Sequence, residues 1–189
     1  WNFCTSPDGK HVAWFAVRDG NRIDTTDARP LELLVGDGEA AAPHATLLHQ
    51  AAAWPDYQAR GPIWLPDSSG VLVGYDTRDE QWVTTAHVLI IDLEGKRQPL
   101  VQLPNAGVQS VAISHQGRTI VVVTRESAPG EVEHQTWLRI YDRVGKPQSA
   151  VETTMAPGLA APSPDGRLVA LSGYQELFAG EVGDLKLRS

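Results

Sequence analysis

Ser114 and His115 are adjacent residues of the types that do acyl-transfer chemistry, because a histidine base can activate a serine hydroxyl as a nucleophile. Their side chains would have to converge, whereas adjacent residues of an extended chain point to opposite faces. The chain also lacks a G-x-S-x-G sequence, the turn that presents the nucleophilic serine of α/β-hydrolases. We therefore expect Ser114 and His115 to form a turn, and we expect the chain not to be an enzyme.

Metal-ligating residue types are present, but not at the spacing of a metal site. His44 and His49 lie five residues apart, whereas ligands on one face of a strand are an even number of residues apart. Segment 18–27 is rich in oxygen ligands, yet they are out of register with a calcium loop. We expect no metal, and for 18–27 a calcium site remains the alternative to a solvated polar loop.

Cys4 is the single cysteine, so no intrachain disulfide can form. Neither a CxxC sequence nor a charged helix start accompanies it, which predicts a buried and unreactive thiol. Gly36 and Gly38 form a glycine pair without the strand-to-helix context of a dinucleotide site. We therefore expect no cofactor.

The composition is that of an ordinary globular protein, with 42% hydrophobic and 21% charged residues in 189. A net charge of −7 argues against a general nucleic-acid binder. No segment approaches the roughly 18 consecutive apolar residues of a membrane span, so none is expected. The chain begins at Trp1 without a signal segment, and we expect it to be a processed chain or part of a longer one.

Turn signals recur along the chain, and the strands between these turns must position the candidate residues. They read SPDG at 6–9, PDSSG at 66–70, SHQG at 114–117 and SPDG at 163–166. Their closing glycines are 61, 47 and 49 residues apart (70−9, 117−70, 166−117). A period of this size predicts a repeat architecture. The residues assigned to these turns are Pro7, Asp8, Gly9, Pro66, Gly70, Gly117, Pro164, Asp165 and Gly166.

Each turn lies within the same order of four strand-like runs. A short run precedes it, and an apolar run rich in valine and isoleucine follows, as at 119–125, which predicts burial on both faces. A second apolar run and a more polar outer run complete the unit, and Pro99 and Pro147 are tolerated in outer edge strands. The repeats span roughly 1–53, 60–103, 106–153 and 158–189.

Four repeats of four antiparallel strands predict an all-β chain, a β-propeller of about four blades in a single domain over 1–189. The alternative is a β-sandwich with coincidental turns. In the turn, proline fixes φ, aspartate bonds its own backbone, and glycine takes the left-handed position.

The segments "SPDGKHVAWFAVRDGNR" and "HVLIIDLEGKRQPL" resemble the bacterial WD-like propeller repeats of TolB and of prolyl-oligopeptidase-type propeller domains. The resemblance covers essentially the whole chain, although the third repeat, with SHQG, lacks the proline and aspartate of the pattern. It implies a protein-binding role and a periplasmic or extracytoplasmic location.

Strand order places the long connections on one side of such a propeller. These are 18–30, 51–61, 78–86 and 126–136, they are acidic, and Glu126 is among their carboxylates. Long loops on a rigid scaffold commonly bind partners, and the alternative is that they are tolerated insertions. The candidate partner-binding residues are Trp54, Tyr57, Trp82, Asp19, Asp24, Glu80 and Glu131. The two tryptophan side chains either contact a partner or pack over the edge of a blade.

We expect a non-enzymatic protein-binding or scaffold module, an accessory subunit whose partners are other protein subunits. The alternative is the propeller portion of a longer hydrolase or sensor. The chain opens on an inner strand and ends on an outer one, so its ends exchange no strand. An open arc would expose apolar faces of its end blades. We therefore expect it to belong to a longer propeller or to bind partners there, the alternative being a self-closed four-bladed ring.

Overall fold

The computed structural model describes residues 3–17, 29–37, 45–54, 61–81, 83–127, 134–153, 159–172 and 177–188. These residues form strands and turns without a helix, which confirms the prediction of an all-β chain. Within the same described part, no helix is long and apolar enough to cross a membrane.

The strands form four consecutive antiparallel units, which we call blades 1 to 4. Blade 1 comprises β1 (Phe3–Thr5), β2 (His11–Val17), β3 (Arg29–Asp37) and β4 (Ala45–Trp54). Blade 2 comprises β5 (Ile63–Trp64), β6 (Gly70–Arg78), β7 (Thr84–Asp92) and β8 (Arg97–Pro104). Blade 3 comprises β9 (Ala106–Ile113), β10 (Thr119–Ser127), β11 (His134–Asp142) and β12 (Pro147–Thr153). Blade 4 comprises β13 (Ala160–Pro162), β14 (Leu168–Ser172), β15 (Leu177–Glu181) and β16 (Asp184–Arg188).

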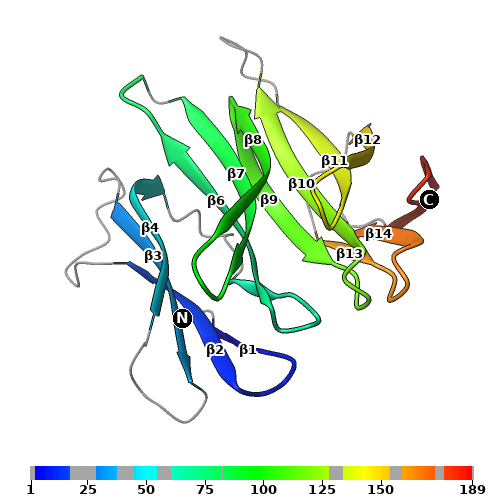
Figure 1. Cartoon of the computed structure of the whole chain (residues 1–189). Helices are drawn as coiled ribbons and strands as arrows, with labels where there is room; N and C mark the ends of the chain where they lie inside the picture. The colour runs from blue at the N-terminus through cyan, green and yellow to red at the C-terminus, as the bar shows by residue number, and fades with distance from the viewer. Residues whose placement is uncertain are drawn as a thin grey trace.

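The blades fan out as an arc, with blade 1 at one end and blade 4 at the other (Figure 1). The turns that join β1 to β2, β5 to β6, β9 to β10 and β13 to β14 lie on one side of the arc, which we call the turn side (Figure 1). The connection between β6 and β7 lies on the opposite side, the loop side (Figure 1). For these described connections, the structure agrees with the prediction from strand order that the short turns and the β6–β7 connection lie on opposite sides.

Alternating burial explains the continuous apolar runs. In β10, Ile120 and Val122 pack against blade 2, whereas Val121 and Val123 pack against blade 4. All four side chains are fully buried. Because successive side chains of a strand point to opposite faces, a strand between two blades needs apolar residues at every position. The prediction of burial on both faces is confirmed.

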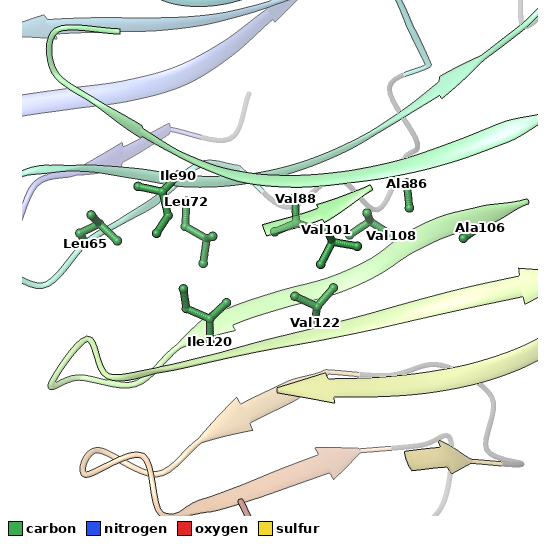
Figure 2. Packing of buried hydrophobic residues seen from close by; sticks show 10 residues of the cluster. All are labelled: Leu65, Leu72, Ala86, Val88, Ile90, Val101, Ala106, Val108, Ile120 and Val122. Atoms are coloured by element: carbon green, nitrogen blue, oxygen red, sulfur yellow. The ribbon is translucent and has the colours of Figure 1, made fainter. Parts of the chain in front are cut away.

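Three apolar cores fill the spaces between successive blades. The first core comprises Ala13, Leu33, Val35, Trp64, Val71, Val73, Tyr75, Leu89 and Ile91. The second comprises Leu65, Leu72, Ala86, Val88, Ile90, Val101, Ala106, Val108, Ile120 and Val122, and Figure 2 shows Leu72 and Val88 above Ile120 and Val122. The third comprises Val121, Val123, Leu138, Ile140, Ala160, Val169 and Leu171. Blades therefore adhere face to face through side chains rather than through shared strands.

Blades 1 and 2 are an exception, because β4 also pairs with β6. Ala53 lies opposite Thr77 and Trp54 opposite Asp76, so the two blades form one eight-stranded sheet. The inner strand β5 is two residues long and covers β6 only at Val71 and Leu72. The end of β4 pairs with the part of that edge which β5 leaves free, where backbone N–H and C=O groups need partners. The prediction that residues 51–54 belong to a loop was wrong.

The second turn differs from its predicted geometry. Gly9, Gly117 and Gly166 take positive φ angles of 73°, 70° and 73°, as expected, but the equivalent residue in the second turn is Ser68 at 60°, not Gly70. The positive-φ residues of successive turns are therefore 59, 49 and 49 residues apart in the sequence (68−9, 117−68, 166−117). Gly70 instead begins β6, where a Cβ would lie 2.4 Å from the Ile91 carbonyl oxygen. The close approach of the β7 backbone therefore explains why a residue without a side chain occupies position 70.

Candidate interaction surfaces

Few of the candidate partner-binding residues lie in the described part of the chain. Asp19, Asp24, Tyr57, Trp82 and Glu131 fall outside it, as does the whole of segment 18–27 with its possible calcium site. Trp54 is described as a strand residue of β4, and its side chain is outside the described set. Glu80 is described and exposed, in the connection between β6 and β7.

Asp79 holds this connection in a defined shape. Its carboxylate Oδ1 accepts hydrogen bonds from the backbone N–H groups of Gln81 at 3.0 Å and Val83 at 2.8 Å. Its own N–H donates to the Val83 carbonyl oxygen at 3.2 Å. An aspartate that bonds nearby backbone groups fixes a turn. Glu80 and Gln81 consequently project to solvent from a rigid base on the loop side.

Glu126 was predicted to lie in a loop, but it belongs to β10. It forms an ion pair with Arg139 of β11, and it accepts a hydrogen bond from the Thr124 hydroxyl at 2.6 Å. Arg139 also donates to that hydroxyl oxygen at 2.8 Å and lies 5.1 Å from the Trp137 ring centroid. Arg139 pairs with Val122, so this polar group faces blade 2. The Glu126 carboxylate is occupied within the fold, and strand register, which sequence does not supply, places it there.

Asp76 connects blade 2 to blade 3. The Val108 N–H of β9 donates to its Oδ1 at 2.9 Å, and the Asp76 side chain is buried. A buried carboxylate is costly unless hydrogen bonds compensate for its lost hydration. Asp76 is not among the predicted site residues, because the segment "VGYDT" has the pattern of one apolar strand with a polar end.

His87 and Tyr75 form a stacked pair on the opposite face of blade 2. Their ring centroids lie 4.9 Å apart, and Thr77 Oγ1 is 2.8 Å from His87 Nε2. Burial lowers the pKa of His87. The neutral imidazole therefore predominates at neutral pH, and it serves packing between strands β6 and β7.

Ser114 is a turn residue, as expected. Its buried hydroxyl oxygen accepts the N–H groups of Arg118 at 3.2 Å and Thr119 at 3.1 Å, while His115 is exposed. Ser6 and Ser163 make the equivalent bond in their own turns, to the N–H of His11 and Leu168, at 2.9 Å each. The hydroxyl thus closes the turn, and the same geometry recurs in three blades.

The turns also bond to one another across blades, which sequence reasoning missed. The Asp8 N–H donates to Ser68 Oγ at 3.1 Å, linking blades 1 and 2. The Thr119 hydroxyl donates to the Gly166 carbonyl oxygen at 2.9 Å, linking blades 3 and 4. Arg143 links blades 2 and 3 through Asp67. The turn side is therefore a continuous row of joined turns.

Cys4 is half-buried, whereas the sequence predicts a buried thiol. Its thiol donates to the Pro62 carbonyl oxygen at 2.6 Å, and burial raises its pKa to about 11. The Trp64 indole N–H donates to the Cys4 carbonyl oxygen at 2.9 Å, which joins blades 1 and 2. Among the described residues, no group of three or more His, Cys, Asp or Glu side chains could hold a metal ion.

The end blades carry apolar rows on their outer faces. In blade 1, Phe3 lies opposite Trp14 and Trp14 lies opposite Leu34, and Phe3 is 70% exposed. Directly opposed residues of antiparallel strands share a face. In blade 4, three alanines form the corresponding row across β13, β14 and β15, and these are Ala161, Ala170 and Ala179.

Comparison with known proteins concerns the fold. The sequence matches no protein-family model and no curated protein. Among solved structures, 96% of the chain matches 54% of the β-propeller domain of the Trilobed protease from Pyrococcus furiosus, with a TM-score of 0.62 and 12% identity. This chain has the β-propeller fold. It also matches 63% of a TolB-like protein from Agrobacterium tumefaciens over 98% of its own length, with a TM-score of 0.56 and 16% identity.

A third similar structure is the acylaminoacyl peptidase of Pyrococcus horikoshii, of which 30% matches 94% of the propeller chain, with a TM-score of 0.60 and 10% identity. Identities this low establish the fold and nothing about activity. The chain spans about half the length of the Trilobed protease domain. The predicted resemblance to TolB-like and peptidase-type propellers is confirmed at the level of fold.

Proposed function

We propose that this β-propeller is a non-enzymatic, protein-binding module that serves as an accessory or scaffold subunit of a larger assembly. The observation that carries the proposal is the difference between the two sides of the arc. On the turn side, hydrogen bonds join each blade to the next. On the loop side, Asp79 fixes the β6–β7 connection so that Glu80 projects to solvent. Exposed connections on a rigid scaffold are where binding residues concentrate.

Three described side chains of types that can act in catalysis instead interact within the fold, which supports a binding role. The Ser114 hydroxyl oxygen accepts backbone N–H groups of its turn, the Cys4 thiol is protonated at neutral pH, and Glu126 is paired with Arg139. Each of these groups stabilises the fold. None of the three is placed as a nucleophile beside a free base.

The proposed partners are other protein subunits, which bind at the loop side and at the end blades. A net charge of −7 favours protein partners over nucleic acid. The fold similarity to a TolB-like protein supports a bacterial, periplasmic or otherwise extracytoplasmic location. A second candidate is the propeller portion of a longer hydrolase or sensor, and the similarity to part of an acylaminoacyl peptidase favours it.

Site-specific photo-crosslinking in bacterial cells tests the leading proposal. A photoreactive phenylalanine analogue replaces Glu80 on the loop side or Lys10 on the turn side, both of which are exposed. We expect adducts with another protein at position 80 and few at position 10. Equal yields at the two positions would contradict binding through the loop side. Peptide or ester turnover by the purified chain that Ser114→Ala abolishes would contradict the non-enzymatic role.

A further inference from the structure

The turns of blades 1 and 4 have the same local structure around an Asp–Gly bond. In blade 1, the Ser6 hydroxyl donates to Asp8 Oδ1 at 2.6 Å, and the Gly9 N–H donates to the Ser6 carbonyl oxygen at 2.9 Å. The equivalent hydrogen bonds of Asp165 and Gly166 in blade 4 have the same two lengths. Both glycines have a φ of 73°. The two Asp–Gly bonds therefore form a pair that is matched in sequence and in local geometry.

An Asp–Gly bond is chemically labile, because glycine has no side chain to hinder its backbone nitrogen. When this nitrogen attacks the aspartate Cγ, a C–N bond forms, and one carboxyl oxygen leaves as water with the carboxyl proton and the amide proton. Water then adds to a carbonyl of the succinimide ring and reopens it, so the net reaction is an isomerisation that needs no oxidant or reductant. Opening at the original backbone carbonyl leaves isoaspartate, in which the main chain runs through Cβ.

Each turn by itself opposes this reaction. The attacking N–H is already hydrogen-bonded within the turn, and the Asp–Gly peptide must rotate before its nitrogen faces Cγ, so the turn has to open locally. The reaction also needs a protonated carboxyl, and the hydrogen bond from the serine hydroxyl lowers the pKa of Asp8 and of Asp165. These effects are shared by the two turns, so they do not distinguish the two bonds.

Contacts from blade 3 distinguish the turn of blade 4. The Gln116 N–H donates to the Pro164 carbonyl oxygen at 3.1 Å. The Thr119 hydroxyl donates to the Gly166 carbonyl oxygen at 2.9 Å, so the peptide groups before and after the Asp165–Gly166 bond are both anchored to blade 3. Gly166 is also buried, and a Cβ added there would overlap with the Thr119 side chain. The Asp165–Gly166 peptide can therefore rotate only if blade 4 moves away from blade 3.

The turn of blade 1 is held less closely in this 189-residue chain. From blade 2, Ser68 Oγ accepts the Asp8 N–H at 3.1 Å. Gly9 is exposed, and apart from its chain neighbours no described residue lies within 4 Å of a Cβ added there. The Asp8–Gly9 peptide can consequently rotate while the blades stay in place.

We propose that Asp165–Gly166 is a latent isoaspartate site, which the packing of blade 3 against blade 4 protects. It converts when the two blades separate, and the separation then becomes permanent, because the additional main-chain methylene prevents the turn from closing. This inference goes beyond the proposed binding role and does not depend on it. In the folded chain, conversion at Asp8–Gly9 should exceed conversion at Asp165–Gly166 by roughly tenfold, since the latter must break an additional interblade hydrogen bond and uncover a buried glycine.

The isoaspartate content of the two turns, measured over time, tests this proposal. The 189-residue chain is incubated at neutral pH, and labelling by an isoaspartate methyltransferase followed by peptide mass spectrometry quantifies each site. In guanidinium chloride the two sites should convert at equal rates, because their local sequences, SPDGK and SPDGR, are nearly identical. Equal rates at the two sites in the folded chain would overturn the proposal.

Two variants separate the blade contact from overall stability. Thr119→Val removes the hydroxyl that binds the Gly166 carbonyl oxygen, and it should accelerate conversion at Asp165 several-fold while leaving Asp8 unchanged. Ser68→Gly is the matched control, because it removes the acceptor of the Asp8 N–H and suits the φ of 60° at that position. It should leave conversion at Asp165 unchanged. A rise at both sites in Thr119→Val, or none at Asp165, would contradict protection by blade 3.

Discussion

Arg143, in the turn after β11, reaches Asp67 in the turn before β6, with its Nη2 2.5 Å from the Asp67 Oδ2. The same nitrogen donates to Ser69 Oγ at 3.0 Å. Burial of Asp67 would raise the pKa of its carboxyl, but the hydrogen bonds from Ser69 and Arg143 outweigh burial and lower the pKa to about 2. One side chain of blade 3 therefore binds the turn of blade 2.

Arg143→Ala should lower the free energy of unfolding by about 0.2–1 kcal/mol, because both partners are partly exposed and water screens the pair. Asp67 has a lowered pKa in the folded state, so its contribution is complete above its ordinary pKa near 3.8 and is lost as the pH falls towards 2. Urea unfolding at neutral and acidic pH measures this. Arg118→Ala, at an exposed position of the next turn, is the control and should have no effect.

Gly70→Ala should destabilise the fold by roughly 1–3 kcal/mol, the usual cost of overpacking. A Cβ at this position would lie 2.4 Å from the Ile91 carbonyl oxygen and 3.0 Å from the Asp92 Cα. Both contacts are with backbone atoms, so relief requires strands β6 and β7 to separate. Gly183→Ala is the matched control, since nothing lies within 4 Å of its added Cβ. Equal thermal midpoints for the two variants would contradict the close approach.

Asp76→Ala should cost about 1–3 kcal/mol, because it leaves the buried Val108 N–H without its acceptor. Asp76→Asn retains an acceptor oxygen of the same reach and should cost less. Chemical denaturation of the two variants gives the comparison. A loss as large in Asp76→Asn as in Asp76→Ala would show that charge, rather than this hydrogen bond, matters at the site.

Cys4 should react slowly with alkylating reagents in the folded protein. Burial raises its pKa from 9.0 to about 11, so the reactive thiolate is about a hundredfold rarer at pH 8 than in the unfolded chain. Iodoacetamide labelling with and without urea, followed by mass spectrometry, measures the ratio. Comparable rates in the two states would mean that the thiol is not held against the Pro62 carbonyl oxygen.

Much of the fold follows from local patterns in the sequence. Valine or isoleucine occupies every position of 120–123. Because successive side chains of a strand point to opposite faces, this run alone indicates a strand that is apolar on both faces. Ser6 and Ser163 stand at the same place in two SPDG turns, and both close their turn with the same hydrogen bond. Such features depend on residues close in sequence, so recurrence along the chain reveals them.

The tertiary structure determined the features that depend on neighbours distant in sequence. Trp54 is in a strand because β5 is too short to cover the edge of β6. Glu126 pairs with Arg139 because strand register brings them together across β10 and β11. Gly70 is required by the backbone of β7, not by the turn it follows. Each outcome depends on which backbone groups and volumes a neighbouring strand leaves free, and that information appears only once the blades are packed.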